Sequence, residues 1–281
     1  MRRVLTPHLS ALGFESGSRA RIGAVLQRYL LQHRRSLIRS FDIFFWPVMD
    51  LLIWGFVTLY IQEAAGGPIA QLIIFLIGAM ISWDIHYRGQ QAVTLSLMEE
   101  IWTRNIVNML IAPIRLWEWV AASFLYGLLK VSIVTLLLAL LAQGLYAFEL
   151  ARVGWAFLPL AAHLLFFGWA IGLFTAGLLL RFGYAAEALI WGIPFLIQPF
   201  SCVFYPVSVL PGWAQGIALC LPSTYIFEAL RRVLQAGTVS GMTWLLIGGL
   251  NLLYCALGAA LFVWMFRRAR AAGRLARLGQ D

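Results

Sequence analysis

Residues 96–119 read SLMEEIWTRNIVNMLIAPIRLWEW and form a polar, charged island between two long apolar stretches. The apolar side chains of the island recur at the spacing of one face of a helix: Trp102, Ile106, Met109 and Leu110. Pro113 is placed to end that helix, because proline lacks the backbone donor that a helix interior needs. We therefore predict a short amphipathic helix over residues 96–113.

The polar residues of the island fit the same prediction. Glu99 and Glu100 would lie in the first turn of the helix, where its dipole favours negative charge. Arg104 follows Glu100 by four residues, so the two side chains could pair along the helix surface. An ordinary solvated loop is the plainer alternative, but such a loop has no need of an apolar stripe.

The composition around the island is that of a membrane protein. Of the 281 residues, 62% are hydrophobic and only 12% are charged. About 20 apolar residues suffice to cross a bilayer as a helix. We predict an all-α polytopic fold with six transmembrane helices, at about residues 43–62, 70–92, 117–143, 154–181, 187–205 and 243–266.

The positive charge sets the expected orientation. The net charge is +9, and the arginines gather in residues 2–39, before the first predicted span, and 267–277, after the last. Basic residues mark cytoplasmic ends, and an even number of spans puts both ends on one side. Both termini and residues 96–119 are thus predicted to be cytoplasmic. The charge could touch anionic membrane lipid, whereas a nucleic-acid partner is not expected.

The chain divides into three parts. Residues 1–42 are predicted to form a cytoplasmic N-terminus with one amphipathic helix at the membrane interface, over Arg19 to Phe41. Residues 43–266 form the six-span transmembrane domain, and residues 267–281 a basic cytoplasmic tail.

Residues 206–242 differ from the other apolar segments. Pro206, Pro211 and Pro222 interrupt them, which leaves two short helical pieces around Trp213 to Leu221 and Thr224 to Gln235. Irregular backbone at membrane depth survives only where protein buries it or it lines a cavity. We predict a re-entrant external helical hairpin between spans five and six; a half-buried external cap is the alternative.

Ionisable residues interrupt the second predicted span. Asp84, His86 and Arg88 are candidates for function, because burying such groups in a membrane is costly. Asp84 and Arg88 are four residues apart and can form an ion pair along one helix face. This intramembrane pair is one interpretation. The other is that the three residues line a substrate path, where Asp84 and His86 could relay protons in an ion-coupled secondary transporter.

The sequence lacks the motifs of several enzyme classes. It contains no GxxxxGK[ST], HExxH or GxSxG pattern, and its histidines and its three cysteines are scattered without metal-ligand spacing. We therefore predict no catalytic residue, no metal site and no cofactor bound by this chain.

Two stretches resemble those of a known family. They are MEEIWTRNIVNMLIAPI, at residues 98–114, and FYPVSVLPGWAQGIALCLPSTYIFEALR, at residues 204–231. In both stretches, and in the order of its elements, the chain resembles the transmembrane subunit of type-2 ATP-binding-cassette exporters. This family includes exporters of polysaccharides, lipid-linked glycans and drugs. In the second stretch, Pro206, Pro211, Pro222 and the run Glu228 to Arg231 match its layout.

The resemblance implies a function and partners. The chain would be the permease of an exporter in the bacterial inner membrane, moving a lipid-linked glycan, glycolipid or hydrophobic drug outward. It would pair with a second copy and with two cytoplasmic ATPase subunits, which would bind the ATP and magnesium. Residues 96–113 would be the coupling helix, and its ATPase-coupling residues would be Glu99, Glu100, Trp102, Arg104, Asn105 and Met109. The first and fifth spans would meet across the dimer and enclose the path.

Overall fold

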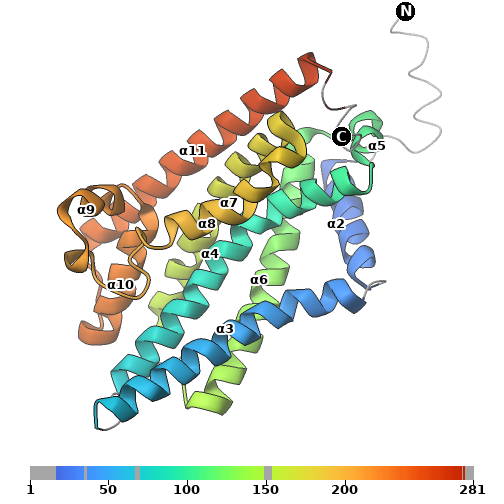
Figure 1. The fold of residues 1–281 in the computed structure, drawn as a ribbon. Helices are drawn as coiled ribbons and strands as arrows, with labels where there is room; N and C mark the ends of the chain where they lie inside the picture. Colours follow the sequence, from blue (N-terminus) through green and yellow to red (C-terminus); the bar gives the residue numbers. More distant parts are fainter. Residues whose placement is uncertain (1–16, 35–36, 67–69, 149–153, 274, 276–281) are drawn as a thin grey trace, which may run out of the picture.

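The computed structural model describes residues 17–34, 37–66, 70–148, 154–273 and 275 (Figure 1). Within these ranges the chain is helical and contains no strand. Its α-helices are α2 (Ser18–Arg34), α3 (Leu37–Ala64), α4 (Ala70–Trp102), α5 (Ile106–Ile111), α6 (Leu116–Tyr146), α7 (Phe157–Phe182), α8 (Glu187–Ile197), α9 (Gly212–Leu219), α10 (Pro222–Ala236) and α11 (Gly241–Ala271). Two short 3-10 helices, η2 (Gly183–Ala186) and η3 (Val207–Val209), lie in connections.

Four helices in the described part of the chain are long and apolar enough to cross a membrane. They comprise Ile43–Ala64 within α3, Leu116–Tyr146 of α6, Gly154–Phe182 with α7, and Gly241–Ala271 of α11. These helices coincide with the first, third, fourth and sixth spans that the sequence predicts. The chain is therefore a multi-pass membrane protein.

The other two predicted spans differ from the expectation. The second lies inside α4, a helix of 33 residues that continues to Trp102 and carries most of its polar side chains into the protein. The fifth, predicted at residues 187–205, is wrong as a single membrane-length helix, because α8 has 11 residues and ends at Ile197. Pro199 cannot donate to the helical ladder, and Cys202 adopts a left-handed conformation with φ of 54°.

The centre of the bundle is a stack of α4, α7 and α11. A Cβ atom on Gly172 of α7 would lie 2.6 Å from the carbonyl oxygen of Gln90 in α4. A Cβ on Gly258 of α11 would lie 2.5 Å from the carbonyl oxygen of Ala170 in α7. Glycine at these positions lets the backbones touch, which is how helices pack tightly inside a membrane.

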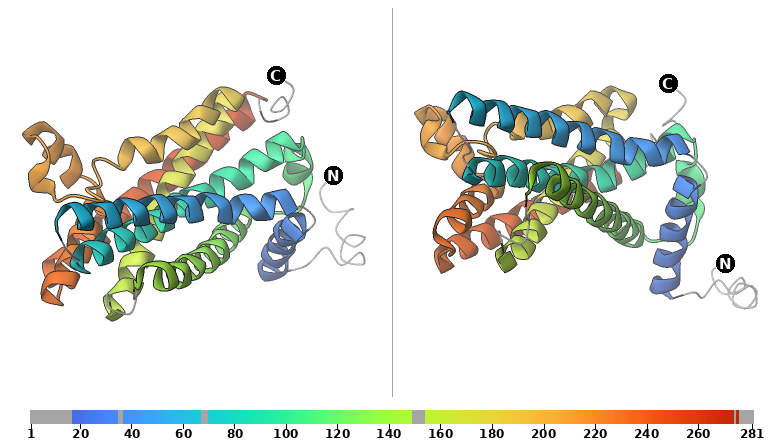
Figure 2. Two further views of the ribbon diagram at one scale, coloured as in Figure 1. Left: turned by 60° about the horizontal axis from the view of Figure 1, so that its bottom comes forward. Right: turned by 90° about the horizontal axis from the view of Figure 1, so that it is seen from below.

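The N-terminal helix is shorter than predicted. The single helix expected over Arg19 to Phe41 is wrong, because α2 ends at Arg34 and a second helix, α3, begins at Leu37. Figure 2 shows α2 running across the end of the bundle, while α3 lies along α4. Residues 1–16 of the predicted N-terminus lie outside the described residues, as do parts of the predicted tail and external loops.

The two ends of the bundle carry different elements (Figures 1 and 2). The helix α5, the start of α2 and the end of α11 lie at one end. The helices α9 and α10 lie at the opposite end, with the end of α3 and the start of α4. We call the first the α5 end and the second the hairpin end.

Candidate functional site

The polar island forms a helix–turn–helix at the α5 end. The prediction of one helix over residues 96–113 is wrong, because α4 extends to Trp102 and α5 begins only at Ile106. Arg104 between them is left-handed, with φ of 54°. Ala112 is extended, with ψ of 150°, as the residue before a proline usually is. Pro113 thus ends α5, as the sequence predicted.

The break changes which side chains α5 presents. Ile106, predicted as part of the exposed stripe, is only 1% exposed, while Met109 is half-buried. The exposed apolar side chains are instead Trp102 at 47%, Val107 at 42% and Ile111 at 77%. The side chain of Leu110 lies outside the description. Arg104 is exposed and Asn105 half-buried beside this surface. We call Trp102, Val107 and Ile111 the apolar tip.

Glu100 does not face outward. Its carboxylate is 1% exposed and accepts hydrogen bonds from Arg28 at 2.8 Å and from the Asn105 amide at 2.6 Å. Glu99 and Glu100 lie in the last turn of α4 rather than in the first turn of a new helix, so the predicted dipole stabilisation is wrong. An arginine from α2 neutralises Glu100 instead.

The helix α2 contacts the segments on both sides of α5, which are the end of α4 and the start of α6. We call these segments the flanks of α5. On the α4 side it binds Glu100 through Arg28. On the α6 side, Arg21 donates from Nε and Nη2 to the two carboxylate oxygens of Glu118, at 2.9 and 2.7 Å. Such bidentate pairs are among the strongest polar contacts in proteins. Neither arginine was predicted from the sequence as a partner of the island, because 72 residues separate Arg28 from Glu100 and 97 separate Arg21 from Glu118.

A buried aromatic contact joins the same helices. Tyr29 is 1% exposed, and its phenol oxygen accepts a hydrogen bond from the Trp119 indole at 2.7 Å. Burial and the negative charge of Glu100 raise the pKa of Tyr29 to about 12, so the phenol stays neutral at physiological pH. The flanks of α5 are therefore fixed to α2 by both charge and packing.

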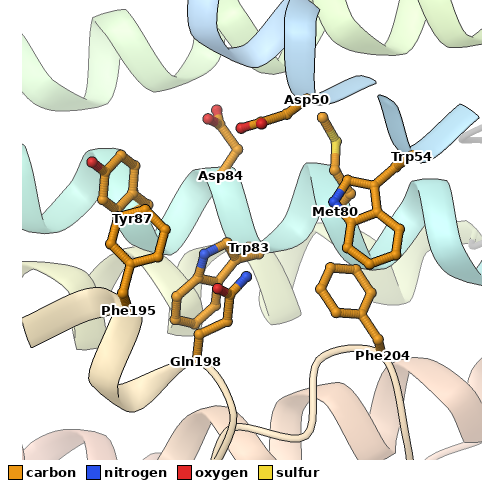
Figure 3. A pocket seen from close by; sticks show the side chains of 9 residues that line it. All are labelled: Asp50, Trp54, Met80, Trp83, Asp84, Tyr87, Phe195, Gln198 and Phe204. Carbon is orange, nitrogen blue, oxygen red and sulfur yellow. The ribbon is translucent and has the colours of Figure 1, made fainter. Parts of the chain in front are cut away.

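A second site lies between α3, α4 and α8 (Figure 3). It is a cavity of about 220 Å³ with mostly aromatic walls. Its lining consists of Asp50, Trp54, Met80, Trp83, Asp84, Tyr87, Phe195, Gln198 and Phe204. Figure 3 shows the carboxylates of Asp50 and Asp84 pointing toward one another from α3 and α4.

The three ionisable residues predicted in α4 occupy different surroundings. Arg88 Nε donates to both carboxylate oxygens of Asp84, at 2.7 and 3.0 Å, and Asp84 lines the cavity. His86 is fully buried against α7, where Nδ1 lies 3.4 Å from the Leu164 carbonyl oxygen. No hydrogen bond joins His86 to Asp84 among the described residues, and the proton relay of a secondary transporter stays a prediction.

The prolines of the predicted hairpin sit at helix starts. Pro206 precedes η3, Pro211 precedes α9, and Pro222 is the first residue of α10. Proline is well placed there because the first backbone donors of a helix have no intrahelical partner. The two short helices that the sequence predicts in this region are present as α9 and α10.

Side chains of α10 bind the turn that follows α8. Glu228 accepts a hydrogen bond from the Val207 backbone at 3.0 Å. Arg231 donates to the carbonyl oxygens of Tyr205, at 2.6 Å, and of Cys202. Glu228 and Arg231 both belong to the run that matched the family, but their backbone partners were not predicted, since nothing in a sequence pattern reveals them. These contacts hold irregular backbone in place.

In the described part of the chain, no cluster of three or more His, Cys, Asp or Glu side chains could hold a metal ion. The prediction that this chain binds neither metal nor cofactor stays a prediction.

Comparison with known proteins identifies the chain. The family model for the ABC-2 type transporter matches residues 21–235, which include most of α2 and of α10, both flanks of α5, and the cavity. No curated protein matches the chain. The family supplies the membrane permease of transporters that work with an ATP-binding-cassette ATPase, and catalysis is not a task of this component. The chain belongs to the ABC-2 type transporter family, as a multi-pass membrane permease.

Proposed function

We propose that the chain is the permease of an ATP-driven exporter and that α5 is its coupling helix. In this proposal two copies form the membrane path, and two ATPase subunits bind ATP and magnesium below them. The substrate is amphipathic, such as a lipid-linked glycan, a glycolipid or a hydrophobic drug, and it moves outward across a bacterial inner membrane. Both termini are cytoplasmic.

The observation that carries the proposal is the apolar tip. Trp102, Val107 and Ile111 are exposed at an end of the bundle where arginines also gather, in α2 and at the end of α11. Exposed apolar side chains grouped on a polar surface mark interaction sites. Tryptophan in particular contributes much of the binding energy where it fills a pocket of a partner. A cleft of an ATPase fits this surface.

The contacts of α2 support a role in transmission. A push on α5 acts on a turn whose two flanks are bound to α2 through Glu100 and Glu118. Because α2 packs on α6 through buried Tyr29 and Trp119, it would move together with the turn. The force would thus reach several helices rather than one loop.

The cavity supports the proposed path. It opens between α3 and α8, the helices that contain the first predicted span and the start of the fifth. The outward faces of both helices carry exposed aromatic side chains, including Trp46 and Phe56 of α3 and Phe195 of α8. A second copy placed on these faces would enclose the cavity, and its aromatic walls would accommodate the apolar part of a substrate.

Six membrane crossings fit the placement of the elements at the two ends of the bundle. The helix α4 would be the second crossing, since its polar side chains face the protein. The helix α8, together with the turn that α10 holds, would form the fifth. The α10 helix packs against α4, α7 and α11 at the hairpin end, which is compatible with a re-entrant hairpin.

The experiment is co-purification of the permease with its ATPase in mild detergent. Trp102→Ala should weaken ATPase binding by more than about 1 kcal/mol, the usual threshold for an important interface residue, and should reduce export. Trp155→Ala is the matched control, because Trp155 is 89% exposed but lies near the start of α7, away from α5. Equal binding by the wild type and Trp102→Ala would remove α5 from the coupling role.

A further inference from the structure

A groove on another face of the bundle is unlike the cavity between α3 and α8. It lies between α6 and α11, with Leu173 of α7 at its floor, and encloses about 570 Å³. Its lining consists of Leu116, Trp117, Val120, Ala121, Phe124, Leu173, Ala259, Phe262, Val263, Phe266, Arg267 and Arg270. The two arginines are the only charged side chains of the groove in the part of the chain that the structure describes. The groove shares no helix with the lining of the other cavity.

The length of the groove fits one leaflet of a bilayer. Leu116 and Phe124 of α6 are eight residues apart in the sequence, which corresponds to about 12 Å along a helix. Ala259 and Arg270 of α11 are eleven residues apart, or about 16 Å. Half of the hydrocarbon core of a bilayer is about 15 Å thick. The groove is thus about as long as one leaflet of the hydrocarbon core is thick.

The charges lie at one end of this groove. Arg267 and Arg270 belong to the last turns of α11 and are exposed. A neighbouring cavity shares Leu116, Phe266 and Arg270 with the groove and adds Arg115. Among the described residues, no Asp or Glu side chain lines either space. The nearby Glu118 is held by Arg21 of α2. The mouth of the groove is therefore a positive site above an apolar channel.

Trp117 places this mouth at the membrane surface. It is 52% exposed at the first turn of α6 and lines the groove together with the two arginines. Tryptophan side chains concentrate at the boundary between lipid headgroups and acyl chains. Arginines just beyond that boundary lie where the phosphates of lipids are found.

We propose that this groove is a binding site for an anionic membrane phospholipid of the leaflet at the α5 end. One acyl chain occupies the channel between α6 and α11. The headgroup phosphate accepts hydrogen bonds from Arg267 and Arg270, with Arg115 close by. Guanidinium groups suit this task because their planar donors match phosphate oxygens in pairs. The site does not rest on the proposed coupling role of α5.

The adjacent Arg268 provides a matched control. It lies on the same turn of α11 and has the same charge, but its guanidinium stacks on the Trp264 ring at 4.8 Å and it lines a different cavity, with Arg181. A general attraction between anionic lipid and the positive end of α11 would depend on all three arginines. A specific site depends on Arg267 and Arg270 alone.

The experiment measures lipid retained by the purified permease, or by its complex where an ATPase co-purifies. The protein is incubated with equal amounts of phosphatidylglycerol and phosphatidylcholine that carry the same acyl chains. Native mass spectrometry then counts each bound lipid. The wild type should retain phosphatidylglycerol in preference. Because each arginine near the membrane surface attracts anionic lipid, Arg267→Gln with Arg270→Gln should lower this preference by about tenfold or more. Arg268→Gln should change it less than twofold.

Two further variants separate the site from folding and topology. Arg267→Lys with Arg270→Lys keeps the positive charge that orients the last span, loses the paired donors, and should keep part of the preference. Ala121→Phe fills the channel without changing charge and should reduce the retained phosphatidylglycerol severalfold. Equal retention of both lipids by the wild type would overturn the site. An equal loss of the phosphatidylglycerol preference in Arg268→Gln, or full retention of phosphatidylglycerol by Ala121→Phe, would also overturn it. A lipid-linked saccharide found in the groove of protein taken directly from membranes would do the same.

Discussion

Arg21 and Glu118 join α2 to α6 through two parallel hydrogen bonds, from Nε and Nη2 to the two carboxylate oxygens. The Glu118 side chain is fully buried, and its Oε2 also accepts a hydrogen bond from the Arg115 backbone at 2.9 Å. One carboxylate thus holds both the start of α6 and the helix that crosses the end of the bundle.

Removing the charge of Glu118 should impair export while ATPase binding remains. Glu118→Gln keeps the size of the side chain but leaves Arg21 without a charged acceptor, so α2 should loosen from α6. We expect ATPase binding to remain, the thermal unfolding temperature to fall, and export per ATP hydrolysed to drop severalfold. Glu63→Gln, at an exposed position near the end of α3, is the control. Unchanged export efficiency in Glu118→Gln would contradict the transmission role of α2.

Substitutions of Ile111 and of Glu100 should affect different properties, ATPase binding in the first case and the stability of the permease in the second. Ile111→Ala removes part of the apolar tip and should weaken ATPase binding by about 1 kcal/mol, with little effect on the stability of the permease alone. Glu100→Ala removes the acceptor of Arg28 and Asn105, so it should destabilise the α4–α5 turn. Isothermal titration calorimetry with the ATPase measures binding, and thermal unfolding measures stability. Together they distinguish the two variants. Normal stability with lost binding in Glu100→Ala would mean that its carboxylate contacts the partner directly.

The pair of Asp84 and Arg88 offers a test of the cavity. Asp84→Asn leaves a largely buried guanidinium without its anion, which typically costs about 3 kcal/mol. The exchanged pair, Asp84→Arg with Arg88→Asp, should recover part of this loss. Thermal unfolding in detergent measures both. If the single and exchanged variants lose equal stability, the role of Asp84 lies in lining the cavity and not in its pairing with Arg88.

Arg231 should matter more for the hairpin end than Pro222. Arg231→Gln removes charged hydrogen bonds to the carbonyl oxygens of Cys202 and Tyr205, each worth about 1.5–3 kcal/mol. Pro222→Ala changes the first residue of α10, where the added backbone donor needs no helical partner, so the loss should be below about 1 kcal/mol. Protease accessibility of residues 200–210 in membranes compares the two. A larger effect of Pro222→Ala would contradict the role of Arg231 in holding the turn that follows α8.

Labelling can establish the orientation of the bundle. In a chain whose Cys202, Cys220 and Cys255 are replaced by alanine, a cysteine at Gly216 should react with an impermeant reagent added outside the cell. A cysteine at Gly273 should react only after permeabilisation, because the arginines around it favour the cytoplasm. Both positions are exposed in the described structure. The reverse pattern would invert the proposed direction of export.

The sequence predicted the apolar helices well, since length and hydropathy depend only on neighbouring residues. It also predicted α9 and α10, because prolines mark their starts. It misplaced the end of α8, since an apolar run conceals the missing donor of Pro199. At the island it assumed one continuous helix. Because Arg104 is left-handed, the faces of α5 are not continuous with those of α4. The side chain of Ile106 is therefore buried, while those of Val107 and Ile111 are exposed.

The partners of the acidic side chains required the fold. Glu100 and Glu118 look like surface charges because their arginines lie in α2, far away along the chain. By contrast, Asp84 and Arg88 lie on the same helix at the spacing that allows contact, so their pairing was one of the expected alternatives. Local spacing is visible in a sequence, whereas long-range charge pairing is a property of the packed structure.

The glycines of the central stack limit how this permease can change shape. Where Gly172 and Gly258 bring backbones into contact, α4, α7 and α11 cross without side chains between them, so these crossings have little room to slide or rearrange. They should behave as a fixed frame in every stage of a transport cycle. Widening of the cavity then falls to α3 and α8, which meet the frame through side chains such as Leu51 and Ile190. The size of those two side chains should set how readily the path opens.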